Sequence, residues 1–528
     1  MRRNNLLLMR PIRRIRTAIL LCFFSFSLSG CDSASENAAQ AGAEAQQYFD
    51  QRNFYEARKS ITEALAARDD DPKLHILKGR IELASGRPTD AFLAYSDALS
   101  LEATNPEALQ AVSQLGLQTG YLREAERAAD TMLSFSPELP EALLTKGLIA
   151  LVRRKHKEAL GFSERILAGR PGDEAGTILK ARTLALTGKT DEALELLENF
   201  SPNENYTEGV DMTLIELFRE TSNLSEMKAT FKRLIARRPE DMALKIDYAN
   251  TLYKSGERGQ ARALIEEILR SGLTAKRALT MITDLWLEYE TDPLDENLLA
   301  FLSKEGTLEA RIAIARYLLS TGKADDAKTV MQSVSARVSP EATALYARTL
   351  NASGQTDEAV EIASRILEDD ETNADALLVI IQKSLAEENF SKAINDAQIV
   401  IRDNPKLRAG YLSLVGVYAA KNDESGMKRV FADASKQLPQ DPILFRAFTQ
   451  HLLDNGDQIR AVSIARSFAR DTPASIKAWR LYLETCEKAG LDRCKLEASS
   501  GEKIANTIYA VDLPPGTPPT RGLFGRLK

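Results

Sequence analysis

The sequence predicts an all-α solenoid of about fourteen stacked helix pairs, and three periodic columns of residues support this prediction. A small residue recurs with a spacing near 34 residues from roughly residue 38 to residue 508. In many units Gly stands five residues before it and Pro twelve residues after it. A fixed period of this length is typical of solenoids, in which each unit is one supersecondary element that stacks on its neighbours.

We call the small residue the anchor, because it marks the point where two helices of a unit must approach closely. Ten anchors are alanines: Ala57, Ala91, Ala125, Ala159, Ala193, Ala261, Ala327, Ala359, Ala393 and Ala461. Small residues such as Gly79 and Gly147 recur twelve positions before the anchor. The Gly column fits a tight turn between helices, since positive φ costs Gly little, and the Pro column ends each unit.

These columns resemble the tetratricopeptide repeat in their period, their small-residue positions and their final Pro. The resemblance spans nearly the whole chain after the N-terminal segment. It implies a right-handed superhelix of helical hairpins. It also implies a concave groove, lined mainly by the first helix of each pair, that binds other proteins.

The repeat is weakest at residues 271–305, which lack the Ala and Gly anchors. We expect sequence drift within one continuous stack here, with a distorted pair, a hinge or a seam as alternatives. The predicted organisation is therefore a first half at 41–305 and a second half at 306–508. A Pro-rich basic tail follows at 509–528, either solvated or lying over the final helix, with a docking peptide as the alternative.

Residues 1–30 predict an export signal. Six Arg and no acidic residue precede an apolar stretch at 17–28, which is shorter than the roughly 20 residues that span a bilayer. The stretch runs into Leu28-Ser29-Gly30-Cys31, which resembles the lipobox of bacterial lipoproteins. The resemblance implies cleavage before Cys31 and acylation of its thiol, with residues 31–40 as a lipidated tether. Several acyl chains attach a protein stably to a membrane.

The lipobox resemblance also implies where the protein is located. It implies a lipid-anchored protein of the bacterial cell envelope that faces the periplasm. Asp32 resembles the retention signal for the inner membrane, so we favour that membrane, with the outer membrane as the alternative. In an oxidising compartment, Cys486 and Cys494 are a candidate disulfide across one inter-helix turn, with two buried thiols as the alternative.

Composition disfavours several function classes. The formal net charge is −6 and aromatic residues make up 6%, whereas nucleic-acid binders carry basic surfaces and stacking platforms. His75, His156 and His451 lie in different units, so we expect neither a metal site nor a catalytic His. The sequence has no nucleotide-binding or nucleophile-elbow motif. We therefore expect no enzyme activity, no cofactor and no small-molecule substrate.

The leading hypothesis is a non-catalytic, lipid-anchored envelope scaffold that binds envelope proteins through its concave groove. Its layout is loosely similar to lipoproteins linked to exopolysaccharide export and surface-protein sorting. One alternative is direct binding of glycan or peptidoglycan, which would favour an aromatic-lined groove; Trp286 and Trp479 lie in distant units. Another alternative is an activator of an envelope synthase.

Overall fold

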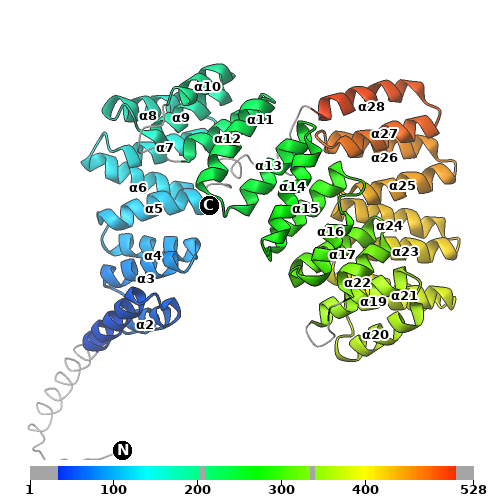
Figure 1. The fold of residues 1–528 in the computed structure, drawn as a ribbon. Coiled ribbons are helices and arrows are strands. Elements are labelled where there is room, and N and C mark those ends of the chain that lie inside the picture. Colours follow the sequence, from blue (N-terminus) through cyan, green and yellow to red (C-terminus); the bar gives the residue numbers. More distant parts are fainter. Residues whose placement is uncertain (1–33, 201–207, 333, 335–338, 507–528) are drawn as a thin grey trace, which may run out of the picture. The chain divides into compact units, whose positions relative to one another are not determined.

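The computed structural model describes residues 34–200, 208–332, 334 and 339–506. These residues form helices joined by turns, with no strand among them, so the predicted all-α solenoid is confirmed. The chain divides into two compact units between Thr213 and Leu214. We call residues 34–213 unit 1 and residues 214–506 unit 2, and Figure 1 shows the helix order within each.

Unit 1 opens with a helix over residues 34–50. The helices that follow are α2 (Phe54–Ala67), α3 (Pro72–Ala84), α4 (Pro88–Leu101), α5 (Pro106–Thr119), α6 (Leu122–Phe135), α7 (Pro140–Val152), α8 (His156–Gly169), α9 (Glu174–Leu186) and α10 (Thr190–Glu198). Helix α11 (Gly209–Glu220) spans the division into unit 2.

Unit 2 continues in the same manner. Its first part holds α12 (Leu224–Arg237), α13 (Met242–Lys254), α14 (Arg258–Arg270), α15 (Lys276–Tyr289), α16 (Glu296–Lys304), α17 (Leu308–Ser320), α18 (Ala324–Met331) and α19 (Pro340–Ala352). Its second part holds α20 (Thr356–Asp369), α21 (Ala374–Ala386), α22 (Phe390–Asp403), α23 (Arg408–Ala420), α24 (Glu424–Gln437), α25 (Pro442–Asp454), α26 (Gln458–Asp471), α27 (Ile476–Lys488) and α28 (Asp492–Ala505).

Each repeat is a hairpin of a first and a second helix, such as α3 with α4 or α19 with α20. First helices also contact one another from pair to pair, as α5, α7 and α9 do in unit 1 and α15, α17, α19, α21 and α23 do in unit 2. Among the described second helices, only α16 and α18 make comparable contact. The first helices are therefore closer together, and each stack curves so that they line its concave side.

The anchor column lies where the helices of a pair meet. All ten anchor alanines have 0% exposure. Close helix packing also explains the small residues on the first helices. A Cβ on Gly147 would lie 2.4 Å from Leu179 Cδ2, and one on Gly79 would lie 2.6 Å from the Tyr95 ring. At these distances a Cβ would force the neighbouring side chain to move, so glycine allows the helices to pack closely at both positions.

The residue five positions before each of the ten anchor alanines has positive φ. Gly occupies it in many units, for example Gly120 with φ 88° and Gly354 with φ 85°. Other units place a larger residue in the same left-handed conformation: Arg52, Arg154, Ser222, Glu388 and Asn422. The left-handed turn is therefore a feature of the repeat itself, and repeats without Gly tolerate the backbone strain of a side chain at positive φ.

Helix starts follow from local capping. Asp71 Oδ1 accepts a hydrogen bond from Lys73 N at 2.9 Å, and Asn105 Oδ1 accepts one from Ala108 N at 3.1 Å. Pro72 and Pro106 occupy the first helical turn directly after these caps. Pro is tolerated there because the first N–H groups of a helix have no partner within the helix.

Two features differ from the expected organisation. Residues 34–40, assigned to the tether, are helical, and Ala38 is buried against α2 and α3; the three Ala of this segment favour helix. At residues 271–305 the shortened helix α16 packs chiefly against α18 and makes little contact with α15, so this repeat is distorted. The two compact units divide at 213/214, and within unit 2 helix α15 packs against both α13 and α17, so the stack continues through residues 271–305.

Candidate protein-binding surface

The exposed faces of the first helices form the candidate binding surface, because these helices line the concave side of each stack. The surface differs in character between the two units. Unit 1 presents aliphatic side chains there among polar ones such as Gln110 and Gln114, whereas unit 2 presents charged side chains that are paired with one another.

In unit 1 a row of aliphatic side chains runs across α3, α5, α7 and α9. Leu83 and Leu186 are 46% and 53% exposed, and the remaining members are half-buried. We call this set the apolar row: Leu83, Leu117, Leu144, Leu148, Ile178 and Leu186. An ion pair between Arg80 and Glu107 lies among the first two helices of the row. Such a surface fits an apolar segment of a partner, because burying aliphatic area on both sides drives association.

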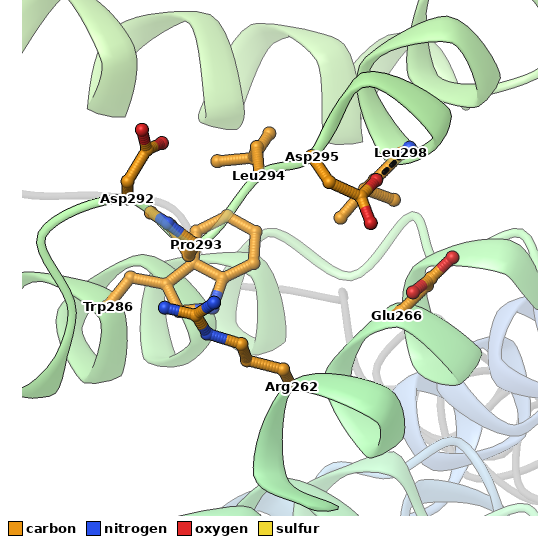
Figure 2. A pocket seen from close by; sticks show the side chains of 8 residues that line it. All are labelled: Arg262, Glu266, Trp286, Asp292, Pro293, Leu294, Asp295 and Leu298. Atoms are coloured by element: carbon orange, nitrogen blue, oxygen red, sulfur yellow. Dashed lines mark hydrogen bonds between the residues drawn. The ribbon is translucent and has the colours of Figure 1, made fainter. Parts of the chain in front are cut away.

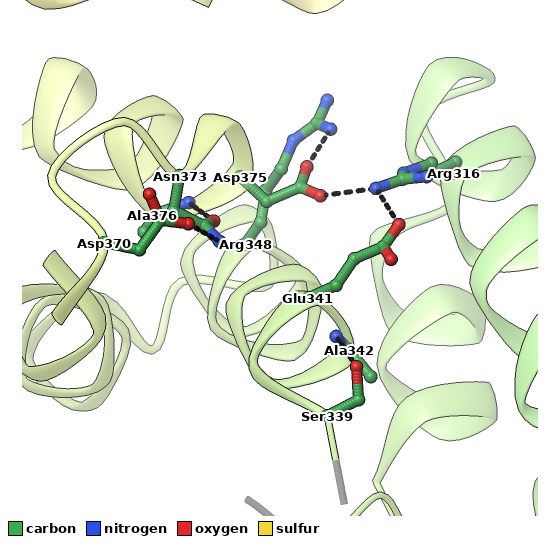
Figure 3. Close-up of polar contacts among 9 residues, drawn as sticks. All are labelled: Arg316, Ser339, Glu341, Ala342, Arg348, Asp370, Asn373, Asp375 and Ala376. Atoms are coloured by element: carbon green, nitrogen blue, oxygen red, sulfur yellow. Dashed lines mark hydrogen bonds and ion pairs between the residues drawn. The ribbon is translucent and has the colours of Figure 1, made fainter. Parts of the chain in front are cut away.

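In unit 2 a charge cluster links three consecutive first helices (Figure 3). Asp375 on α21 accepts from Arg348 Nη1 on α19 at 2.9 Å and from Arg316 Nη2 on α17 at 2.9 Å. Arg316 also contacts Glu341 Oε1 at 3.1 Å. Burial alone would raise the pKa of the Asp375 carboxyl, but Arg348 and Arg316 outweigh it, so the net pKa is lowered. This buried network fixes the three helices relative to one another.

The concave side of unit 2 is also crossed by contacts between distant repeats. Glu288 on α15 accepts from Ser475 Oγ at 2.8 Å, Ile476 N at 2.6 Å and Lys477 N at 3.3 Å. These donors belong to the N-terminus of α27, almost 190 residues away. A carboxylate at a helix N-terminus satisfies free N–H groups and complements the helix dipole.

Lys254 on α13 adds a second point of contact. Its Nζ donates to Ala505 O at 2.7 Å, at the end of α28, and to Ala474 O at 3.0 Å, just before α27. Burial lowers the pKa of Lys254 to about 8, although the nearby Glu288 carboxylate acts in the opposite direction. Tyr289 packs against the hydrophobic cluster of the last repeats. We call the contacts of Glu288 and Lys254 with the last repeat the closure contact.

A small pocket lies beside the distorted pair (Figure 2). It encloses about 250 Å³ between α14, the end of α15 and the loop before α16. Its charged groups already have partners: Arg262 pairs with Glu290, and Glu266 Oε1 pairs with Arg270 Nη2 at 2.7 Å. Asp295 accepts from Leu298 N at 2.8 Å as the cap of α16. The pocket's charges thus stabilise the irregular loop.

The structure places the other residues singled out in the sequence as follows. Cys31 and the tail at 509–528 lie outside the described residues. Cys486 and Cys494 are joined by a disulfide with Cα atoms 5.9 Å apart, within the range that a disulfide spans. No group of His, Cys, Asp and Glu that could hold a metal ion occurs in the described part of the chain.

The two tryptophans do not offer a sugar-stacking surface. Trp286 is 1% exposed and packs against Tyr317, with ring centroids 5.4 Å apart. Trp479 is 9% exposed, and its Nε1 donates to Pro473 O at 3.0 Å. Both rings therefore serve the core of unit 2 and do not line an open groove.

Comparison with known proteins is consistent with the repeat geometry. Models of the tetratricopeptide repeat match residues 43–108, 175–199 and 312–374. The chain is 27% identical over 208 residues to cellulose synthase operon protein C of Pseudomonas fluorescens (strain SBW25). That match covers 37% of this chain and 16% of the relative, so the chain spans only a small part of the relative's length.

Solved structures with some likeness include tetratricopeptide proteins. The Thermus thermophilus protein TTC0263 is 22% identical with a TM-score of 0.32, covering 34% of this chain and 99% of that chain. PilW, a type IV pilus biogenesis factor, is 18% identical with a TM-score of 0.31, covering 39% of this chain and 94% of that chain. The fold assignment rests on the helix pairs and the repeat models. On that basis, the chain is an all-helical solenoid, three segments of which match the tetratricopeptide repeat.

Proposed function

We propose that this chain is a lipid-anchored scaffold of the bacterial cell envelope, which faces the periplasm and holds a protein partner on the concave side of unit 1. The apolar row is the observation that carries this proposal. It presents aliphatic side chains from four successive first helices, two of them about half exposed. Exposed aliphatic side chains that recur on successive elements are typical of protein-interaction sites.

Attachment through Cys31 is the second part of the proposal. It is supported by the basic and apolar segments that precede Leu28-Ser29-Gly30-Cys31. Within the described ranges, no helix is both long and apolar enough to cross a bilayer. If residues 1–30 are removed, 63 Lys and Arg face 75 Asp and Glu, so the remaining chain is acidic and would gain little from anionic headgroups. Attachment would then depend on the lipid. Asp32 favours the inner membrane, with the outer membrane as the alternative.

A role in exopolysaccharide assembly is the most specific form of the proposal. It is supported by the similarity to cellulose synthase operon protein C, which is limited to 208 aligned residues. The partner would then be an envelope protein of a polysaccharide-exporting assembly, a synthase included. Direct glycan binding is not proposed, because Trp286 and Trp479 are both buried.

Two experiments test the proposal. Cys31→Ala should move the chain from the membrane fraction to the soluble fraction and abolish metabolic labelling with palmitate. Retention of the unlabelled variant in membranes would show a different anchor. For the partner, crosslinked pull-downs from envelope extracts would compare the unchanged chain with Leu83→Glu/Leu186→Glu and with the control Tyr55→Glu/Phe135→Glu.

The control places the same number of charges on exposed apolar side chains of second helices, since Tyr55 lies on α2 and Phe135 on α6. A stoichiometric protein partner should be lost from the Leu83→Glu/Leu186→Glu bait and kept by the control. Equal recovery by both baits would refute the apolar row as the docking surface. Recovery of glycan without protein would refute the scaffold proposal itself.

A further inference from the structure

The closure contact joins the beginning and the end of unit 2 across its concave side. All of its groups belong to first helices or to the ends of the last repeat: Lys254 on α13, Glu288 on α15, and residues 474–477 and 505 around α27 and α28. The sequence separations run from 187 to 251 residues.

Helix α15 also carries a charged group that senses later repeats. Asp284 lies one helical turn before Glu288 on the same face of α15. The pKa of its carboxyl is raised to about 6, first by burial and then by the charge of Asp441, with Arg408 opposing. Arg408 Nε contacts Asp441 Oδ2 at 2.6 Å, between the starts of α23 and α25. Helix α15 therefore faces the first helices of much later repeats.

The closure contact is rich in polar groups. It includes hydrogen bonds from Ser475, Ile476, Lys477 and Lys254, and Tyr289 packs beside them against the last repeats. Each of these groups would find water if the two ends separated. Hydrogen bonds that water can replace contribute little net free energy, so closed and open forms of such a stack differ by a small amount.

We propose that the closure contact is an autoinhibitory latch. While Glu288 caps α27, the charged concave side of unit 2, which includes the Arg316–Asp375–Arg348 cluster, is closed to a folded partner. The inference rests on the proposed function of protein binding by first helices, but its test requires no partner.

The test measures access to the concave side directly. Gln382 is exposed and lies seven residues after Asp375, on the same face of α21. Glu361 on α20 is an exposed residue of a second helix and supplies the outer control. In the full chain carrying Cys22→Ser and Cys31→Ser, Gln382→Cys or Glu361→Cys would be the only free thiol, because Cys486 and Cys494 are bonded to each other. Each is labelled with a small maleimide and with a maleimide joined to a bulky polyethylene glycol.

The small reagent should label both thiols at similar rates, whereas the bulky reagent should label Gln382→Cys much more slowly than Glu361→Cys. Adding Glu288→Ala should raise the bulky-reagent rate at Gln382→Cys about tenfold, as expected when an open form changes from a minor to a major population. The rate at Glu361→Cys should not change. Lys254→Met, which removes the other half of the latch, should act in the same direction.

An unchanged bulky-reagent rate at Gln382→Cys in both latch variants would overturn the proposal. An equal increase at Glu361→Cys would overturn it too, because that result indicates general unfolding and not opening. Since labelling involves no binding partner, a failed latch and a failed scaffold proposal give separate results.

Discussion

Asp375 should be the most sensitive charged position of unit 2. Its side chain is 4% exposed and lies between Arg348 and Arg316, at 2.9 Å from each. Asp375→Ala removes the counter-charge of two guanidinium groups, and losing one partner of a buried ion pair costs about 3–5 kcal/mol. Arg316 keeps its contact with Glu341, so we expect the lower end, about 3 kcal/mol. Asp375→Asn keeps an acceptor and should cost less.

Tryptophan fluorescence during urea unfolding is the appropriate assay, because Trp286 and Trp479 are the only tryptophans and both lie in unit 2. Glu341→Gln is the matched control: Glu341 contacts the same Arg316 but is 47% exposed, so its loss should cost less than about 1 kcal/mol. The pKa of Asp375 is lowered in the fold, so its contribution is present above the ordinary Asp pKa and lost as pH falls through the folded value. A cost for Asp375→Ala no larger than for Glu341→Gln would refute this reasoning.

Three further predictions follow from the repeat and the interior. Glu388→Gly should stabilise unit 2 by about 0.5–1 kcal/mol in the same assay, because Glu388 has a φ of 55°; a loss of stability would show that its side chain contributes more than the strain. Asp284→Asn should raise the melting temperature at pH 7.5 but not at pH 4. The pKa of the Asp284 carboxyl is raised to about 6 in the fold, so the protonated carboxyl stabilises the fold fully below the ordinary Asp pKa. This stabilisation is lost as pH rises through 6. The gain should stay below about 1 kcal/mol because solvent reaches Asp284, and a gain that persists at pH 4 would have another cause. Ala193→Arg should abolish cooperative melting of unit 1 by circular dichroism, because no buried anchor can hold a charge; unchanged melting would contradict the repeat register.

The periodic part of the fold could be predicted from the sequence because each repeat packs its two helices in the same way, with the same residue types at the same positions. Ala57 and Ala461 lie 404 positions apart, yet both are completely buried at the same point of their hairpins. The Gly column likewise predicts the positive-φ turn. Its exceptions, such as Arg154 and Glu388, could not be assigned from composition, since the conformation there is imposed by neighbouring helices.

The candidate binding surfaces were only partly predictable. Leu144 and Leu148 lie one turn apart on α7, a spacing that could have indicated an exposed apolar face once the helix was assigned to the concave side. The closure contact could not be anticipated. It joins Glu288 to residues 475–477, and that pairing depends on how curvature accumulates over many repeats, which no local pattern encodes.

The most direct test of the scaffold account is site-specific photo-crosslinking in living cells. A photoreactive amino acid is placed at Leu148 in the apolar row, or at Phe135 on the second helix α6 as the outer control. The account predicts one protein partner that crosslinks from position 148 and not from position 135. Equal crosslinking from both positions, or no protein product from position 148, would contradict it.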